Sequence, residues 1–317
     1  MFLKNRLVLG LFIIGMITTV IFFFNRLIHF FSLKNHLLST EAGFFYEWRF
    51  GSVFYTKKGQ GRPLLLLHDL APFSSGYEWH RLESQLAKTN TVYTLDLLGC
   101  GRSDKPSITY TSFLYVQLLT DFLRNVVGEP TQIVGTGSSS AFIIEACNHD
   151  NSFVESVILI NPKPLQALAS LPNKGKKPLR QLLALPLLGT FLYNLSLNKA
   201  SLTKLLKEAY FYDSSKVTGL TIETYTESSQ IKKTEGKFLY ACMISQLTNS
   251  NLFHSLARIH TRLHILSSQG VPNNLEIAKE YQEVLPSIEI ITLEKSSYLP
   301  QLETPDELLE QLEALLL

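Results

Sequence analysis

From Tyr46 onward, short apolar runs of strand length alternate with segments of helical spacing, and this order limits the fold more than any other feature. Parallel strands need long crossover connections, which are usually helices, so the order predicts a mainly parallel sheet with helices on both faces. The expected strands are Ser52–Lys57, Pro63–Leu67, Thr91–Leu95, Thr131–Val134, Val157–Ile160, Leu263–Leu266 and Ile288–Leu293. The expected helices are Tyr77–Lys88, Thr111–Val127, a helix that ends near Cys147, Asn274–Val284 and Thr304–Leu316.

The alternation stops between about residues 163 and 262. This stretch is helical in composition, and it separates the strand at Val157–Ile160 from the strand at Leu263–Leu266. An insertion at that place would form a separate helical cap over one end of the sheet. We therefore expect one α/β domain over residues 44–317, with a cap at about 163–262.

The amino-terminal segment predicts a membrane anchor over residues 1–24. Leu7–Phe24 holds no charge, and its 18 residues would span about 27 Å as a helix, close to the thickness of a bilayer core. A cleaved signal peptide is the alternative, but the run is long for one and no small-residue cleavage site follows it. Basic residues flank both ends, so the side of the membrane stays open. Residues 25–43 are expected to form a juxtamembrane linker.

Composition excludes several classes of function. The 317 residues carry a formal charge of only +2, and no basic patch suggests a nucleic-acid partner. Gly99-Cys100-Gly101 is too short for a dinucleotide fingerprint, which has a third glycine and opens a helix. The three cysteines form no metal-binding pattern and are expected to be reduced and buried. The sequence therefore predicts no cofactor and no metal.

Four segments resemble the α/β-hydrolase superfamily, in the branch with a helical cap. Leu64–Asp69 is similar to the strand that ends in His-Gly beside the oxyanion hole, and Asp96–Ser103 is similar to the D-x-x-G-x-G-x-S loop. Ile133–Ser140 lies where the nucleophile elbow belongs, and Leu299–Pro305 resembles the segment just after the catalytic histidine. The resemblance covers roughly residues 50 to 317. It implies a nucleophile, an acid and a histidine, in that chain order.

The nucleophile position has two interpretations. The usual spacing of the family places Gly137 there, and glycine has no nucleophilic group. A shift of two residues gives the elbow Gly137-Ser138-Ser139-Ser140-Ala141 with Ser139 as nucleophile. We favour Gly137, and the shifted elbow remains the alternative because element boundaries are the least reliable part of such an interpretation. On the structural interpretation, the serines simply cap the start of a helix.

The acid and base positions of the resemblance hold neither group. Gly270 stands at the acid position, and the alternative acid site after Val157–Ile160 reads Asn161-Pro162. Tyr298 stands where the histidine precedes Leu-Pro, and a phenol with an ordinary pKa near 10 is a poor base at neutral pH.

The oxyanion side of the implied site comprises His68, Asp69, Leu70 and Ser138. In this family the histidine shapes the loop and does not move protons. Asp69 replaces a glycine, and a carboxylate there would repel a developing oxyanion.

The residues at the nucleophile, acid, base and oxyanion positions leave three hypotheses for the function. The first is a membrane-anchored protein with a degenerate triad that binds a ligand or lipid with little or no catalysis. The second is an active hydrolase of esters or lipids that uses Ser139, and the third is a membrane-attached interaction module. The empty acid and base positions favour the first over the second. The expected partners are membrane lipids, through the single-pass anchor, and a small apolar or lipid-like ligand under the cap.

Overall fold

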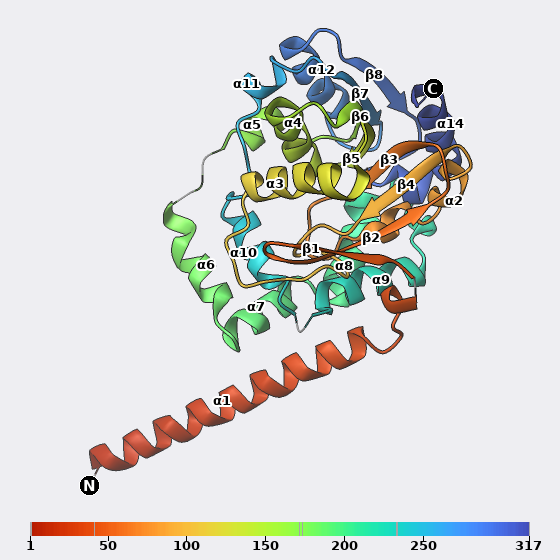
Figure 1. Ribbon diagram of the computed structural model, residues 1–317. Coiled ribbons are helices and arrows are strands. Elements are labelled where there is room, and N and C mark those ends of the chain that lie inside the picture. Colours follow the sequence, from red (N-terminus) through yellow and green to blue (C-terminus); the bar gives the residue numbers. More distant parts are fainter. Residues whose placement is uncertain (1, 41, 171, 173, 233, 317) are drawn as a thin grey trace.

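An eight-stranded sheet forms the centre of the fold (Figure 1). The computed structural model describes residues 2–40, 42–170, 172, 174–232 and 234–316. The order of strands across the sheet is β1-β2-β4-β3-β5-β6-β7-β8. The strands are β1 (Phe44–Trp48), β2 (Gly51–Lys58), β3 (Arg62–Leu67), β4 (Asn90–Leu95), β5 (Thr131–Thr136), β6 (Val154–Ile160), β7 (Arg262–Ser268) and β8 (Glu289–Leu293).

Across the sheet in the order β4-β3-β5-β6-β7-β8, each strand runs parallel to the next one, which confirms the mainly parallel sheet. All seven expected strands are present with shifts of a few residues at their ends. β1 is an addition that the sequence analysis missed, and it forms an antiparallel hairpin with β2. β2 is also antiparallel to β4, so both antiparallel pairs lie at one edge of the sheet.

Helices cover both faces of the sheet, and the run Leu64–Leu67 in β3 explains why. Leu65 and Leu67 belong to the core on one face, while Leu64 and Leu66 belong to the core on the other face. Side chains alternate along a strand, so a continuous leucine run is apolar on both sides. The first face is covered by α3 (Ser112–Phe122), α4 (Ser139–His149) and α12 (Asn274–Val284), and the second by α2 (Glu83–Leu86) and α14 (Pro305–Leu315).

Two expected helices differ in detail. The segment 77–88 is broken into a 3₁₀ turn, η2 (Gly76–Trp79), and the short helix α2. The segment 111–127 is helical throughout, but it ends in a π-helical turn, η3 (Leu123–Val127), after α3.

The loop after β4 is held by a buried ion pair. The Asp96 carboxylate accepts from Arg102 Nε at 2.8 Å, from the Arg102 backbone N–H at 2.7 Å and from the Gly76 N–H at 2.6 Å. The Arg102 guanidinium also lies 3.9 Å from the ring centre of Phe54 on β2. These bonds lower the pKa of Asp96 against the opposing effect of burial, which is the largest single influence on it. The loop is therefore fixed beside the carboxyl ends of β3 and β4.

The chain between β6 and β7 forms a helical insertion, as expected. Its residues pack on the loop after β3 through a third core that includes Phe73, Tyr193 and Tyr225. Lys105, from the Asp96 loop, donates to the carbonyl of Ser228 in the insertion at 2.6 Å. The helices of the insertion are α5 (Leu165–Leu168), α6 (Lys177–Ala184), α7 (Leu188–Ser196), α8 (Lys199–Leu205), α9 (Gly219–Gln230), α10 (Lys237–Ile244) and α11 (Phe253–Leu256).

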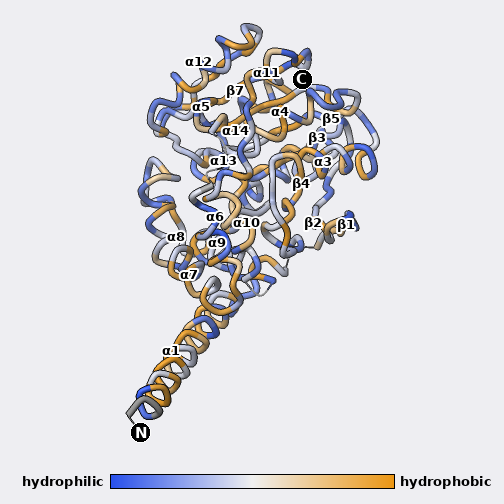
Figure 2. Tube along the Cα trace, turned by 90° about the vertical axis from the view of Figure 1, so that its left-hand side faces the viewer, coloured by the Kyte–Doolittle hydropathy of each residue, from blue (hydrophilic) through white to orange (hydrophobic). Residues whose placement is uncertain are grey.

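The amino-terminal helix α1 (Phe2–Ser32) is longer than the expected anchor, because helix continues through the first part of the expected linker. Its amino-terminal part extends away from the rest of the molecule as an apolar rod (Figures 1 and 2). Its carboxyl-terminal part contacts α7 and α9 of the insertion (Figure 1). Within α1, Asn5–Ser32 is long and apolar enough to cross a membrane, by length and composition alone. A signal sequence passes the same test.

Polar contacts tie this helix to the insertion. Asn25 donates to the Leu187 carbonyl at 3.1 Å and accepts from Asn194 Nδ2 at 3.0 Å. The Phe24 ring meets the Phe191 ring edge-on at 5.2 Å. Beyond α1, the backbone of the turn η1 (Leu38–Thr40) and its preceding residue donates to Glu227 in α9. The end of α1 is therefore part of the folded domain.

Candidate active site

The two interpretations of the elbow concern the turn between β5 and α4. Gly137 lies in this turn with a φ of +59°, a conformation that side chains other than glycine rarely adopt. A Cβ atom on Gly137 would lie 2.0 Å from Tyr298 Oη and 2.7 Å from Asp69 Oδ1. The strained position of the turn therefore belongs to Gly137, while Ser139 already begins the helix α4.

Ser139 is fully buried and its hydroxyl faces away from the elbow. Its Oγ donates a hydrogen bond of 2.5 Å to the backbone carbonyl of His68. A catalytic serine needs a base that takes its proton, and a carbonyl oxygen cannot act as one. The Ser140 hydroxyl donates to the Gly137 carbonyl at 2.6 Å, which is a bond within the turn itself.

His68 has both ring nitrogens engaged. Nε2 accepts the backbone N–H of Leu97 at 3.0 Å, so the proton of the neutral ring resides on Nδ1, which donates to the Asp69 carbonyl at 2.6 Å. Burial lowers the pKa of His68, which keeps the ring neutral. The ring joins the loop after β3 to the loop after β4. Leu70, expected beside the pocket, has its side chain in the hydrophobic core.

The Asp69 carboxylate lies directly over the elbow. Its Oδ1 accepts the backbone N–H of Ser138 at 2.8 Å, and its Oδ2 accepts the Tyr298 hydroxyl at 3.1 Å. Only 3% of Asp69 is exposed. In the resembled enzymes, the N–H of the residue after the nucleophile binds the oxyanion. Here a carboxylate of the chain itself occupies that donor.

Tyr298 occupies the position expected for the base. Burial, and then the charge of Asp69, raises the pKa of Tyr298, so its hydroxyl stays protonated and acts as a donor. Its ring packs against Tyr210 of the insertion, with 4.7 Å between ring centres.

Glu78 is a buried carboxyl that the sequence analysis missed. Its Oε2 accepts the Asp69 N–H at 3.2 Å, and its Oε1 accepts the Tyr225 hydroxyl at 3.1 Å. Burial, and then the charge of Asp69, raises the pKa of Glu78 to about 8. Gln301 donates to the same carboxyl at 3.3 Å. No motif marks Glu78 in the sequence; the one available signal is a charged residue among apolar neighbours just after the His68 loop.

The position expected for the acid is a tight turn after β7. The N–H of Gly270 donates to the Ser296 carbonyl at 2.8 Å, and a Cβ atom there would lie 2.7 Å from the same carbonyl oxygen. At the alternative acid site after β6, the Asn161 amide accepts the Ser268 N–H at 2.8 Å and donates to the Ser268 hydroxyl at 3.0 Å. An amide thus joins β6 to β7 where a carboxylate could orient a histidine.

The site as a whole is a closed polar cluster. The insertion contributes Tyr210 and Tyr225, the loop after β3 contributes Asp69, and the segment after β8 contributes Tyr298. Among the best-defined cavities of the described residues, none is lined by Asp69, Gly137 or Tyr298. Also within the described residues, no group of three or more His, Cys, Asp or Glu side chains could hold a metal ion.

Comparison with known proteins agrees with the fold. Residues 64–311 match the model of the alpha/beta hydrolase family, which is most of the chain. The chain therefore belongs to the alpha/beta hydrolase family.

Individual relatives are distant. An uncharacterized protein of Mycobacterium tuberculosis is 31% identical over 103 residues, which are 32% of this chain and 30% of the relative. A 2-hydroxy-6-oxo-6-(2'-aminophenyl)hexa-2,4-dienoic acid hydrolase of Metapseudomonas resinovorans is 29% identical over 109 residues, 33% of this chain and 37% of the enzyme. The matches thus span about a third of the length of these curated relatives.

One solved structure matches along almost the whole chain. It is described as a membrane phospholipase A and bacterial virulence factor, and it aligns with a TM-score of 0.68 and 16% identity over 98% of both chains. At this identity the likeness concerns the fold alone.

Proposed function

We propose that this protein is a membrane-anchored member of the family that has lost its triad and binds a lipid-like ligand with little or no catalysis. The observation that carries the proposal is the Asp69 carboxylate between the Ser138 N–H and the Tyr298 hydroxyl, above Gly137. Each element of the usual reaction is missing from its position in this arrangement. Gly137 offers no nucleophile, Gly270 offers no acid and Tyr298 offers no base.

The same bond between Asp69 and Ser138 also bears on the stabilisation of an oxyanion. Acyl transfer requires donors that are free to bind the negative oxygen of the tetrahedral intermediate, and loss of one such donor costs about 10²- to 10³-fold in rate. At this site the Ser138 N–H is already bound, and the group that binds it is negatively charged. Hydrolysis would need both a displaced carboxylate and a new base.

The alternative of an active hydrolase rests on Ser139. Its hydrogen bond to the His68 carbonyl and its complete burial argue against it. The nearest ring, His68, is neutral and has both nitrogens engaged. An enzyme of this kind would have to reorganise the whole loop after β3 before it could react.

The membrane anchor is supported by the way α1 ends. Asn25 bonds to both Leu187 and Asn194, so the helix contributes contacts to the folded insertion. Cleavage of the helix as a signal peptide beyond Asn25 would remove these contacts from the folded protein. A solved structure described as a membrane phospholipase A, which aligns over 98% of the chain, is consistent with an anchored form of this fold.

Ester turnover tests the catalytic part of the proposal. Full-length protein in detergent or vesicles is assayed with short-chain and long-chain aryl esters and with phospholipids, beside Ser139→Ala. We expect the wild type and Ser139→Ala to match the background rate. Turnover that Ser139→Ala abolishes would support the active hydrolase instead. The third function, an interaction module without a small ligand, is favoured if no lipid binds specifically.

A further inference from the structure

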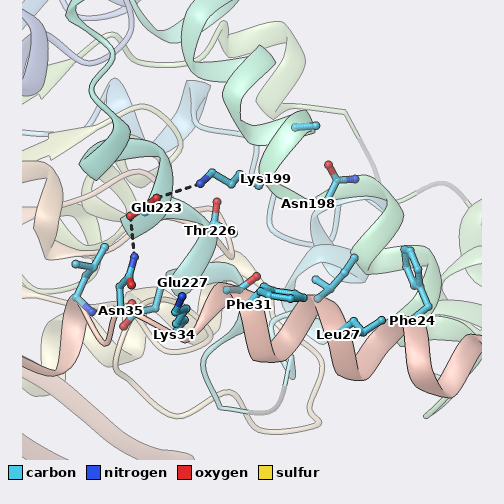
Figure 3. Close-up of a pocket in the computed structure, with 14 residues that line it drawn as sticks. Phe24, Leu27, Phe31, Lys34, Asn35, Asn198, Lys199, Glu223, Thr226 and Glu227 are labelled. Atoms are coloured by element: carbon cyan, nitrogen blue, oxygen red, sulfur yellow. Dashed lines mark hydrogen bonds and ion pairs between the residues drawn. The ribbon is translucent and has the colours of Figure 1, made fainter.

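A groove separates the end of α1 from the helical insertion (Figure 3), and neither Asp69 nor Tyr298 is among the residues that line it. Its volume is about 640 Å³, within the range of small-ligand sites. One wall is α1, and the opposite wall consists of the first turn of α8 and the outer side of α9. Residues that line the groove and carry the argument are Phe24, Leu27, Phe31, Lys34, Ala200 and Glu223.

The wall formed by α1 is apolar and poorly covered. Leu27 is 54% exposed and Phe31 is 67% exposed, although both line the groove. Leaving large apolar side chains against water is unfavourable by about 25 cal/mol for each Å². An acyl chain along this wall would remove that cost.

The opposite wall is polar, and its acidic groups are already satisfied. Glu223 accepts from Lys199 Nζ at 3.1 Å and from Asn35 Nδ2 at 2.9 Å. Glu227 accepts the backbone N–H groups of Leu37 and Leu38 at 2.7 and 3.0 Å. The Lys199 ammonium thus offsets the charge of Glu223, and Glu227 is held by the backbone of the segment that follows α1.

Lys34 is the charge that remains available at the rim of the groove. Its side chain is exposed, and within the part of the chain that the structure describes it makes no ion pair or hydrogen bond. The groove thus joins an apolar wall to a cation, a combination that suits an amphiphile with an anionic head group.

The level of the groove relative to a bilayer also suits such a ligand. Asn5–Ser32 would span about 42 Å as a helix, whereas the hydrocarbon core of a bilayer is about 30 Å thick. The last turns of α1 therefore emerge at the level of the lipid head groups. The groove opens at those turns, from Phe24 to Lys34.

From this juxtaposition we infer that the groove between α1 and the insertion binds one phospholipid of the surrounding bilayer. The acyl chain lies along Leu27 and Phe31, and the phosphate lies at Lys34. The inference rests on the membrane-anchored part of the proposed function, and it places the ligand between the anchor and the insertion, not beneath the insertion. The bound lipid would fix the orientation of the insertion against the membrane.

Photo-crosslinking tests the site directly. Full-length protein is placed in phosphatidylcholine vesicles that contain a small fraction of phosphatidylcholine with a diazirine in one acyl chain, and crosslinked peptides are mapped by mass spectrometry. We expect crosslinks in residues 198–200 and 223–227 as well as in α1. A parallel sample with a diazirine fatty acid identifies the source: labelling of the groove by the fatty acid alone would overturn the phospholipid assignment.

Two pairs of variants sharpen the result. Ala200→Trp fills the groove, and it should lower crosslinking to α9 about tenfold, since each excluded methylene weakens lipid binding severalfold. Lys204→Trp, on an exposed site of the same helix outside the groove, should leave the yield unchanged. Lys34→Glu should lower it severalfold, because it replaces the cation at the lipid phosphate by a carboxylate, while Lys204→Glu should not.

The outcomes separate the inference from the proposed function. Protein that sediments with the vesicles but is crosslinked only in α1 overturns the lipid site and leaves the anchor intact. Protein that does not sediment with the vesicles overturns the anchor, and the lipid site with it. Neither outcome depends on whether the protein hydrolyses an ester.

Discussion

The Asp69 carboxylate accepts the backbone N–H of Ser138 at 2.8 Å, so the loop after β3 is bonded directly to the turn between β5 and α4. The sequence analysis expected Asp69 to repel an oxyanion, and this bond is the observation on which the proposed loss of catalysis rests. The same carboxylate accepts the Tyr298 hydroxyl, so it also fills the space between the nucleophile and base positions.

Asp69→Ala should destabilise the protein by about 1 to 3 kcal/mol, because it removes two part-buried hydrogen bonds, those from the Ser138 N–H and the Tyr298 hydroxyl, at about 0.5 to 1.5 kcal/mol each. Asp69→Asn retains an acceptor for the Ser138 N–H and should cost less. Chemical denaturation of both variants beside the wild type measures the difference. Equal stability of Asp69→Ala and wild type would mean that the carboxylate does not hold this site together.

Glu78 should make stability depend on pH. Its pKa of about 8 in the folded protein lies above the ordinary value of 4.5, so the folded state keeps a proton that the unfolded state loses. The free energy of unfolding should therefore fall as pH rises from about 4.5 to 8, by up to about 1.4 kcal/mol for each pH unit. Denaturation at pH 5.5 and pH 8 checks this slope.

Glu78→Gln should remove that contribution, because a glutamine does not titrate. Glu155→Gln, at an exposed position of β6, should keep the slope of the wild type. The same pH dependence in wild type and Glu78→Gln would assign it to other groups.

Arg102→Ala should destabilise the protein by about 3 to 5 kcal/mol, since it leaves Asp96 as a buried charge without its partner. Arg102→Lys should restore only part of the loss, because an ammonium group cannot reproduce the paired guanidinium bonds. Arg49→Ala is the matched comparison: its pair with Asp121 is half exposed, and its loss should cost at most about 1 kcal/mol.

The fold was predictable because its signal is local and repeated. The Leu64–Leu67 run and the Val157–Ile160 run indicate strands buried on both faces, and the chain order of strands and helices then indicates the sheet. β1 escaped prediction because it follows the expected linker and its pairing with β2 depends on the turn at Arg49-Phe50, which lacks the usual glycine. The length of α1 was underestimated for a related reason: Asn25 and Arg26 interrupt the apolar run, and the contact with Asn194 that supports the helix is remote in sequence.

The candidate site was predictable only where a family motif marks a position. The motif spacing places Gly137 in the turn and Tyr298 beside it, and both lie there. Glu78 and Tyr225 are invisible to such spacing, because they meet Asp69 only after the insertion folds onto the loop after β3. The bond between Asp69 and Ser138 also joins two segments that are distant in the chain. Motif spacing marks both residues as site residues, but it does not predict that they bond to each other.

Membrane anchoring by α1 should survive extraction with alkaline carbonate. The stretch Leu7–Phe24 of α1 holds no charge and prefers the hydrocarbon, so the full-length protein should remain in the membrane pellet. Ile13→Arg with Ile17→Arg places two charges in the span, at about 2.5 to 3.5 kcal/mol each, and should release much of the protein. The matched comparison is Ile222→Arg in α9, outside the span, which should stay in the pellet. Release of the wild type, or a mature amino terminus beyond Phe24, would contradict anchoring by this helix.

Reaction with a fluorophosphonate probe tests the central claim most directly, because the probe labels activated serines regardless of substrate. Full-length protein in vesicles is incubated with the probe beside Ser139→Ala and beside an active serine esterase in the same vesicles. The Asp69–Ser138 bond and the absence of a base at Tyr298 predict that only the esterase is labelled. Stoichiometric labelling of the wild type that Ser139→Ala abolishes would contradict the account.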